Sequence, residues 1–363
     1  MPRKKLQELR KEMRRLDGEI LKLAKKRTDL ARQVGKVKLA SGFPVRDFET
    51  EAEVLEFAEE RCRKQGIDPG LGRTIFRALI RGAVREQEAI HEKRFLGSKR
   101  EITILGGRGK MGSWLAHYFY SRGHRVLIHD PEGPLAGFRS TTSFEKAVDQ
   151  AEILVVSVPL HGAAQIYRKI RKRKPKGVVV DLFSLKSPVL DEIWLGLDEG
   201  LAITSIHPLF GPDVYLLSDR ILVHCPCGNP RADRAVSDLF TDTSLETVKI
   251  PVEEHDRAIG IVLGLAHAVN IIFTEALVRS GFPARDLHRL GTTTFEKQVA
   301  TSSEVAGENP RLYYDIQHLN EHTPEVFRLF ERAFEVFRKA SLGNSSRSFE
   351  AMMSRGRRFY EDL

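Results

Sequence analysis

The chain has 363 residues, of which 41% are hydrophobic, and it carries a net charge of +9 at neutral pH. This length predicts two or three domains, and the composition is ordinary for a globular protein in water. We expect a cytoplasmic protein with no membrane span, because no run of about 18 apolar residues is present and the charged N-terminus has no apolar secretory segment.

The three cysteines, Cys62, Cys225 and Cys227, are too few for a disulfide framework and are typical of a reducing compartment. No second pair of cysteines or histidines stands at zinc-site spacing near Cys225, so we expect no metal. The positive charge is unevenly distributed. Residues 1–100 hold 26 of the 58 lysines and arginines but only 16 of the 49 aspartates and glutamates. Such asymmetry indicates binding of nucleic acid or of small anions, and the alternative is a solvated helical surface.

Residues 6–39 show the spacing of one long helix of about 50 Å. Its apolar positions alternate at three and four residues: Leu6, Leu9, Met13, Leu16, Ile20, Leu23, Leu30, Val34 and Val37. The position after Leu23 in this pattern is Arg27, and Lys38 lies on the same face, whereas Arg10 points elsewhere. A buried guanidinium is costly unless it is paired, so its partner is either an acid, solvent or an anionic ligand.

Gly42 and Pro44 end this helix. Asp47 is positioned to cap a second helix that runs to about Arg63, and a third helix runs from Pro69 to about residue 93. Because a first helix of this length cannot bury its whole seam against two shorter ones, we expect an intertwined dimer of three-helix chains.

After a linker at 92–100 the pattern changes to short β-branched runs separated by segments of helical length, such as "EITIL", "RVLIHD", "AEILVVSVP", "GVVVDLFS" and "LAITSIHP". This alternation predicts a Rossmann-like, doubly wound parallel sheet over residues 100–250. From about residue 250 the pattern is helical again, and "EEHDRAIGIVLGLAHAVNIIFTEALVRSG" is apolar enough to be a buried helix.

The motif Gly107-x-Gly109-x-x-Gly112 follows the strand "EITIL" and opens a helix. Gly107 permits a tight turn, Gly109 lets the backbone approach a pyrophosphate, and Gly112 allows close packing of strand and helix. Asp130 ends the next strand, where a carboxylate binds a ribose 2′-hydroxyl and repels a 2′-phosphate. We therefore predict NAD rather than NADP, against the alternative of an ordinary turn with incidental glycines.

His207 ends a later strand, at the sheet edge where ligands of such folds bind. A histidine there suits proton transfer near neutral pH. Ser184, after another strand, is positioned to orient it by a hydrogen bond, and Lys186 adds a cation. The alternative for His207 is a buried structural histidine.

The motifs "ILGGRGKMG", "SVPLH", "DLFSLKS", "HPLFGPD" and "EEHD" together resemble the prephenate dehydrogenase family over residues 100–340. The resemblance implies that His207 engages the 4-hydroxyl of prephenate while a hydride leaves C4 for NAD⁺ and the ring carboxylate departs as CO₂. It also implies that the helical tail is a dimerisation domain and that His267 lines the substrate pocket. One position departs from the family. Glu304 stands where the family usually has an arginine for a substrate carboxylate. Three explanations are left open: another cation replaces the arginine, the alignment shifts locally, or the substrate or activity is altered.

Residues 6–91 resemble the all-helical chorismate mutase family. The resemblance implies that Arg10 reaches the partner subunit's active site and that Arg27 and Arg46 hold the carboxylates of chorismate. The resemblance also implies that Lys38 and Gln87 bond the ether oxygen and that Asp47 and Glu51 orient the hydroxyl and the pocket.

We therefore predict a bifunctional enzyme of three parts: an all-helical mutase domain at 1–95, an NAD-binding domain at 100–250 and a helical dimerisation and substrate domain at 251–363. It forms a homodimer or a higher homo-oligomer and binds neither nucleic acid nor a membrane. In the alternative interpretation, a prephenate or arogenate dehydrogenase uses its basic N-terminal segment only for dimerisation or binding. A third interpretation is another NAD enzyme, such as a hydroxyacid dehydrogenase, in which His207 is incidental.

Overall fold

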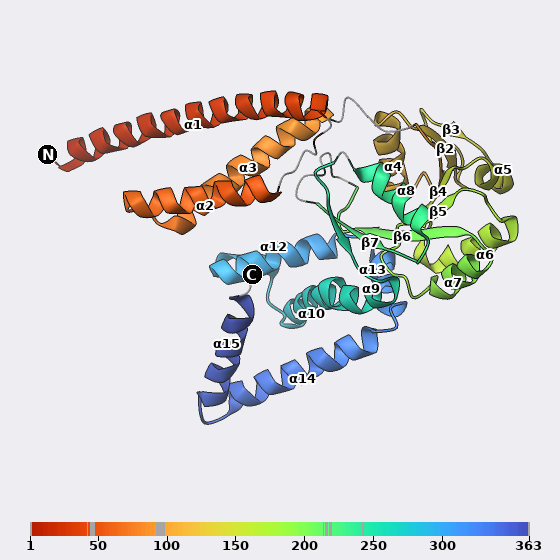
Figure 1. Ribbon diagram of the computed structural model, residues 1–363. Helices are drawn as coiled ribbons and strands as arrows, with labels where there is room; N and C mark the ends of the chain where they lie inside the picture. Colours follow the sequence, from red (N-terminus) through yellow and green to blue (C-terminus); the bar gives the residue numbers. More distant parts are fainter. Residues whose placement is uncertain are drawn as a thin grey trace. The chain divides into compact units, whose positions relative to one another are not determined.

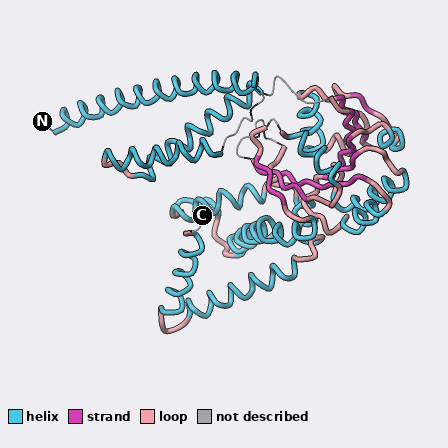
Figure 2. The backbone as a smooth tube through the Cα atoms, viewed as in Figure 1, coloured by secondary structure: helices cyan, strands magenta, loops and turns pink. Residues whose placement is uncertain are grey.

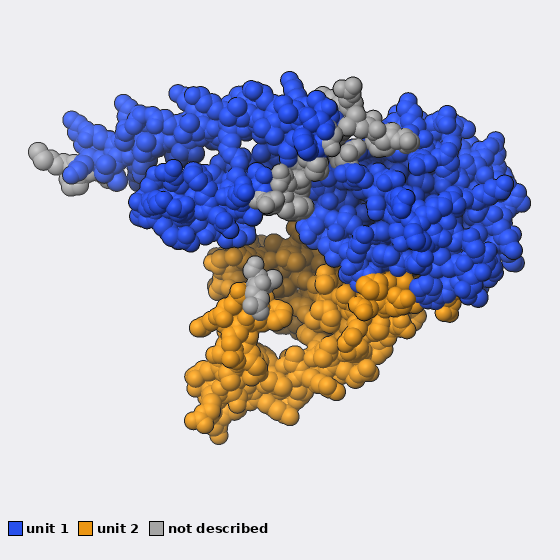
Figure 3. Space-filling view, in the orientation of Figure 1, with its two compact units in different colours: residues 1–183, 192–250 blue, residues 184–191, 251–363 orange. Residues whose placement is uncertain are grey.

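A computed structural model describes residues 2–41, 43, 48–91, 99–212, 214, 217, 220–241 and 243–361. The chain forms two compact units (Figure 3). The first comprises residues 1–183 and 192–250, and the second comprises residues 184–191 and 251–363. The short segment 184–191, which follows a strand of the first unit, thus belongs to the second.

The predicted N-terminal helices are present as α1 (Pro2–Ser41), α2 (Phe48–Gln65) and α3 (Pro69–His91) (Figure 1). Helix α3 packs against both α1 and α2. The carboxylate of Asp68 starts α3 by accepting the N–H groups of Gly70 and Leu71 at 3.2 and 3.1 Å. The proposed cap of α2, Asp47, lies outside the described residues.

Small residues let α1 approach α3 closely. Ala31 and Gly35 are buried, and a Cβ on Gly35 would lie 3.0 Å from Cγ of Gln87. The apolar seam of α1 lies on a different face of the helix and does not pack on α3. Its nine side chains, from Leu6 to Val37, are 45–64% exposed in the single chain. Arg27 lies at the boundary of the two faces, because it is about 40° from Ala31 and about 20° from Val34 on the helical wheel.

An eight-stranded sheet forms the core of the first unit, in the order β3-β2-β1-β4-β5-β6-β7-β8. The strands are β1 (Glu101–Leu105), β2 (Arg125–His129), β3 (Arg139–Ser140), β4 (Ile153–Val156), β5 (Val178–Asp181), β6 (Ala202–Pro208), β7 (Ile221–Cys225) and β8 (Glu246–Lys249). The predicted parallel sheet is confirmed, with one difference: β7 runs antiparallel to β6, opposite Pro208 at Leu222. Parallel neighbours need a long crossover, whereas residues 209–220 connect these two strands directly.

Helices cover both faces of the sheet (Figure 2). They are α4 (Lys110–Ser121), α5 (Phe144–Asp149), the 3₁₀ turn η1 (Leu160–Gly162), α6 (Ala163–Arg173), α7 (Leu190–Asp198) and α8 (Pro230–Phe240). Side chains of α4 and α8 pack on Val180 of β5 and Ile206 of β6. Since side chains alternate along a strand, the next residues, Asp181 and His207, point to the opposite face.

The second unit is helical. It contains α9 (Val252–Ile259), the π-helical η2 (Gly260–Leu265), α10 (Ala266–Arg279), α11 (Ala284–Arg289), α12 (Thr293–Ala306), α13 (Pro310–His318), α14 (Thr323–Leu342) and α15 (Arg347–Tyr360).

The expected buried helix is the continuous stretch Val252–Arg279, but only 17% of its most apolar 18-residue window is buried in the single chain. Its mean hydropathy there is 1.9, so by length and composition alone the helix resembles a membrane span, as a core helix of a globular protein also does. Its polar residues His255, Asp256, His267 and Asn270 are buried, whereas apolar side chains such as Val262 are exposed. The polar side of this helix therefore faces its own unit, and the apolar side faces outward.

Candidate active sites

The glycine-rich turn joins β1 to α4. Gly106 has a φ of +80°, and a Cβ there would lie 2.2 Å from the carbonyl oxygen of Ser157. The tight turn was expected at Gly107, but it is Gly106 that has the left-handed conformation open to glycine. The Gly-Gly dipeptide at 106–107 was the signal that could have indicated this.

The three glycines of the motif are held by close contacts. A Cβ on Gly107 would lie 2.6 Å from Ile128, and a Cβ on Gly112 would lie 2.2 Å from the carbonyl oxygen of Gly106. The second contact is the close packing of strand and helix expected of Gly112. Gly109 precedes α4, and among the described residues no side chain caps its first turn. The free amides of that turn are a binding site for a phosphate.

Asp130 follows β2 beside this turn and is 8% exposed. Its Oδ2 accepts the N–H of Arg108 at 2.9 Å, and its Oδ1 accepts the N–H of Glu132 at 2.9 Å. These two bonds fix the carboxylate next to the glycine-rich turn. This is the position where a ribose hydroxyl would bind.

His207 is the second-last residue of β6 and is 5% exposed. Two residues earlier, the hydroxyl of Ser205 donates to Oδ1 of the buried Asp181 at 2.7 Å. Asp181 is not among the residues predicted from the sequence, although a carboxylate at the end of the apolar strand "VVVD" is a signal for it.

The segment after β5 carries Ser184 and Lys186, and it is bound by Asp256 of α9. Asp256 accepts the N–H of Lys186 at 2.8 Å and both the N–H and the hydroxyl of Ser187, at 2.6 and 2.5 Å. Although burial opposes ionisation, hydrogen bonds from His255 and Ser187 hold the pKa of Asp256 below its usual range. The carboxylate therefore stays charged and fixes the backbone on which the predicted Ser184 and Lys186 stand.

His267 of α10 is 9% exposed and stacks on Tyr313 of α13, with ring centroids 4.1 Å apart. Its Nδ1 is buried and has no hydrogen-bond partner among the described residues. Burial lowers the pKa of His267, which favours the neutral ring. A buried polar atom without a partner is costly, so this nitrogen suits a ligand. Glu304, by contrast, is exposed on α12.

Two of the predicted mutase residues, Arg27 and Gln87, lie where α1 meets α3. Nη1 of Arg27 donates to the carbonyl oxygen of Leu79 at 2.6 Å, and burial lowers the pKa of this guanidinium. Gln87 is 8% exposed, and its Oε1 is buried without a hydrogen-bond partner among the described residues. Lys38 and Glu51 are half-buried.

The other three predicted mutase residues are Arg10, Arg46 and Asp47. Arg10 is exposed on α1, as its direction on the wheel predicts. Arg46 and Asp47 lie outside the described residues. Of the seven predicted mutase residues, three on α1 and α2 are therefore half-buried, and Gln87 on α3 is buried.

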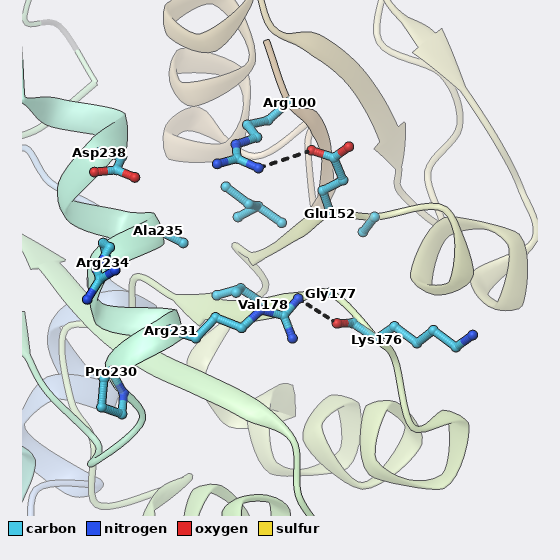
Figure 4. Close-up of a pocket in the computed structure, with 12 residues that line it drawn as sticks. Arg100, Glu152, Lys176, Gly177, Val178, Pro230, Arg231, Arg234, Ala235 and Asp238 are labelled. Atoms are coloured by element: carbon cyan, nitrogen blue, oxygen red, sulfur yellow. Dashed lines mark hydrogen bonds and ion pairs between the residues drawn. The ribbon is translucent and has the colours of Figure 1, made fainter. Parts of the chain in front are cut away.

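A cavity of about 600 Å³ lies at the other edge of the sheet, at the amino ends of β4 and β5 (Figure 4). Arg231 of α8 spans part of it by donating to the carbonyl oxygen of Lys176 at 2.8 Å, and Arg100 pairs with Glu152. None of the residues predicted from the sequence as site residues lines this cavity. Among the described residues no group of three or more His, Cys, Asp or Glu side chains is arranged to hold a metal ion.

Comparison with known families finds three matches along the chain. The family model of type II chorismate mutases matches residues 9–88, and the model of the prephenate dehydrogenase dimerization domain matches residues 251–354. Between them, residues 101–184 match a model described as NADP oxidoreductase, coenzyme F420-dependent.

Individual relatives agree with these models. A T-protein of Enterobacter agglomerans is 24% identical over 327 residues, which cover 90% of this chain and 85% of the relative. A chorismate mutase of Methanocaldococcus jannaschii is 36% identical over 76 residues, which cover 21% of this chain and 77% of the relative. The crystal structure of prephenate dehydrogenase from Aquifex aeolicus, in complex with hydroxyphenyl propionate and NAD⁺, shares this fold. Its TM-score is 0.58 at 20% identity, and the match covers 74% of this chain and all of that one.

Proposed function

We infer that this chain, which belongs to the chorismate mutase family and joins that domain to a prephenate dehydrogenase domain, is a bifunctional enzyme of tyrosine biosynthesis. It rearranges chorismate to prephenate and then oxidatively decarboxylates prephenate to 4-hydroxyphenylpyruvate with NAD⁺. The observation that carries this proposal is the order of the two domains on one chain, which is aligned with a T-protein over 90% of its length.

The mutase reaction is a rearrangement within one molecule, so it needs neither a base nor a nucleophile. The enzyme accelerates it by selecting a compact conformer and by stabilising charge on the breaking ether bond. We assign this reaction to residues 1–95. There Arg27 and Arg46 hold carboxylates, and the amide of Gln87, with Lys38, bonds the ether oxygen. The buried, unpaired Oε1 of Gln87 supports a site that a ligand completes. Asp47 and Glu51 orient the substrate, and Arg10 acts in the partner subunit's site.

The dehydrogenase reaction requires NAD⁺, which accepts the hydride from C4 of prephenate when it is bound. The residues present fit this cofactor, because the uncapped first turn of α4 suits the pyrophosphate and Asp130 suits the ribose. His207 holds the proton of the 4-hydroxyl, which makes loss of the hydride easier, and departure of the ring carboxylate as CO₂ restores aromaticity. We assign Ser184 a catalytic role and assign Lys186 and His267 to binding of the substrate.

Asp130→Asn tests the choice of cofactor. The amide keeps the shape of the side chain but cannot repel a 2′-phosphate, and it bonds the ribose more weakly. We expect the KM for NAD⁺ to rise about tenfold and the KM for NADP⁺ to fall, because a hydrogen bond to a charged group contributes about 1.5–3 kcal/mol. Initial rates of prephenate oxidation with each cofactor measure this. Glu132→Gln, two residues away and exposed, is the matched control and should leave both values unchanged.

Glu304→Arg tests the departure from the family. The cations that could replace the missing arginine are Lys297, Arg311 and Lys186. Arg311 already pairs with Asp315 at 3.1 Å, Lys297 is exposed and Lys186 is buried. A guanidinium at position 304 restores a bidentate partner for a carboxylate, so we expect the KM for prephenate to fall about tenfold. Steady-state kinetics with prephenate, and with arogenate as the comparison, measure the change. A rise in the KM for prephenate would show that Glu304 itself contributes to binding.

We propose that the protein is a cytoplasmic homodimer. The exposed apolar seam of α1 and the outward apolar side of Val252–Arg279 support this, since a second copy would cover both. Feeding chorismate and NAD⁺ to the purified protein tests the function as a whole. Loss of chorismate together with formation of NADH supports the proposal. Formation of NADH from prephenate alone would reduce the N-terminal segment to a dimerisation or binding module.

A further inference from the structure

A buried cluster of three side chains lies at the carboxyl ends of β5 and β6. Asp181 ends β5, Ser205 stands beside it in register on β6, and Tyr167 reaches it from α6. Asp181 and Ser205 are 0% exposed, and so is Tyr167. Burying a carboxylate costs free energy unless it is hydrogen-bonded, so the position of Asp181 in the sheet calls for an explanation.

The carboxylate is hydrogen-bonded from three directions. Oδ2 accepts the phenol of Tyr167 at 2.7 Å, and Oδ1 accepts the hydroxyl of Ser205 at 2.7 Å. Oδ1 also accepts the N–H of Phe183 at 3.3 Å. Burial, together with the adjacent charge of Asp181, raises the pKa of Tyr167 well above its ordinary value. The phenol therefore keeps its proton and remains a donor at every pH at which the protein functions.

These bonds connect the carboxylate to both predicted catalytic segments. Ser205 and His207 are two residues apart on β6, so their side chains point to the same face about 6.6 Å apart along the strand. Phe183 directly precedes Ser184. One carboxylate thus fixes the strand that carries His207 and the start of the turn that carries Ser184.

We propose that Asp181 is a positioning residue of the dehydrogenase reaction, acting through Ser205 on β6 to hold His207 at the sheet edge. Tyr167 supports it from α6. This inference rests on the proposed function. A purely structural role is the competing explanation, because removing these buried hydrogen bonds would also destabilise the fold.

The experiment compares Asp181→Asn in two backgrounds, the parental chain and His207→Asn. The amide is isosteric but replaces one acceptor with a donor, so the hydroxyl that faces the NH₂ group, that of Tyr167 or of Ser205, can no longer donate to residue 181. In the parental background we expect the kcat for NADH formation from prephenate to fall about tenfold or more, since small misplacement of a catalytic group is costly. The KM for NAD⁺ and the mutase rate should stay within about twofold. In the His207→Asn background we expect no further loss, because a residue that acts through His207 has nothing left to position. An equal loss in both backgrounds would overturn the proposal.

Two further measurements keep the proposal testable. If Asp181→Asn fails to fold and the mutase rate falls with it, Tyr167→Phe and Ser205→Ala each remove one donor and should lower kcat by the same route. The second measurement is independent of activity. The Cε1–H resonance of His207, assigned by its loss in His207→Asn, should move in Asp181→Asn and stay unchanged in His117→Asn. An unmoved resonance overturns the positioning role, whereas a parental chain that forms no NADH overturns the proposed function instead.

Discussion

Arg27→Ala is expected to lower chorismate consumption at least about a hundredfold while leaving NADH formation from prephenate within about twofold. The guanidinium is half-buried at the contact of α1 with α3, where it is held by the carbonyl oxygen of Leu79. A cation in such a place stabilises a bound carboxylate far more than an exposed one does. Losing one such donor costs about 10²–10³ in rate in comparable active sites. The decrease in chorismate absorbance and the rate of NADH formation, measured on one preparation, give both values.

Two variants serve as controls for Arg27→Ala. Lys26→Ala removes the neighbouring cation, which is exposed, and should leave both activities unchanged. Arg27→Lys keeps the charge but loses the two-pronged geometry, so it should recover only part of the rate. Equal loss of both activities in Arg27→Ala, with the helical content preserved, would contradict two separate sites. A parental mutase rate in the same variant would show that Arg27 serves the fold of α1 on α3 and not the reaction.

His207→Asn is expected to show the converse pattern. NADH formation from prephenate should fall by about 10²–10⁴, the range that a positioned proton-transfer group contributes, while chorismate consumption stays unchanged. Asparagine keeps a polar side chain at the buried end of β6, which limits the loss of stability. The measurement is kcat and KM for prephenate at saturating NAD⁺, together with the mutase rate.

His117→Asn is the matched control for His207, because this histidine is exposed on α4 of the same unit. It should leave both reactions unchanged. NADH formation at the parental rate in His207→Asn would exclude the proton-transfer role and would favour a structural histidine. A loss confined to the KM for prephenate would instead make His207 a binding residue.

The glycine motif shows which features of a backbone turn can be predicted from residue spacing. The spacing at 107, 109 and 112 located the strand, the turn and the helix, since these residue types permit few other backbones. It placed the tight turn one residue too late. Gly106 has a φ of +80° and lies close to the carbonyl of Ser157, the residue after β4, and the local sequence does not identify this neighbour.

The long helices show the same limit. Periodicity identified α1 and the apolar run at Val252–Arg279. The exposed seam of α1 agrees with the expectation that two shorter helices cannot cover it, whereas the burial expected of Val252–Arg279 is not found in the single chain. Which face of α1 meets α3 depends on Ala31 and Gly35, because small residues allow two helices to approach. The apolar pattern along α1 consists of the large residues of the seam, so it does not identify the face with Ala31 and Gly35 as the one that packs on α3.

The sequence by itself determined the three parts of the chain, the helices, the parallel strands and the presence of a glycine-rich turn between a strand and a helix, because local periodicity and residue chemistry suffice for these. The tertiary structure alone decided the antiparallel pairing of β7, the buried bonds of Asp181 with Tyr167 and Ser205, and those of Asp256 with Lys186 and Ser187. Each of these depends on residues between 14 and 70 positions apart along the chain. Only the packing of the sheet and its helices brings such residues together, so no spacing within one segment predicts them.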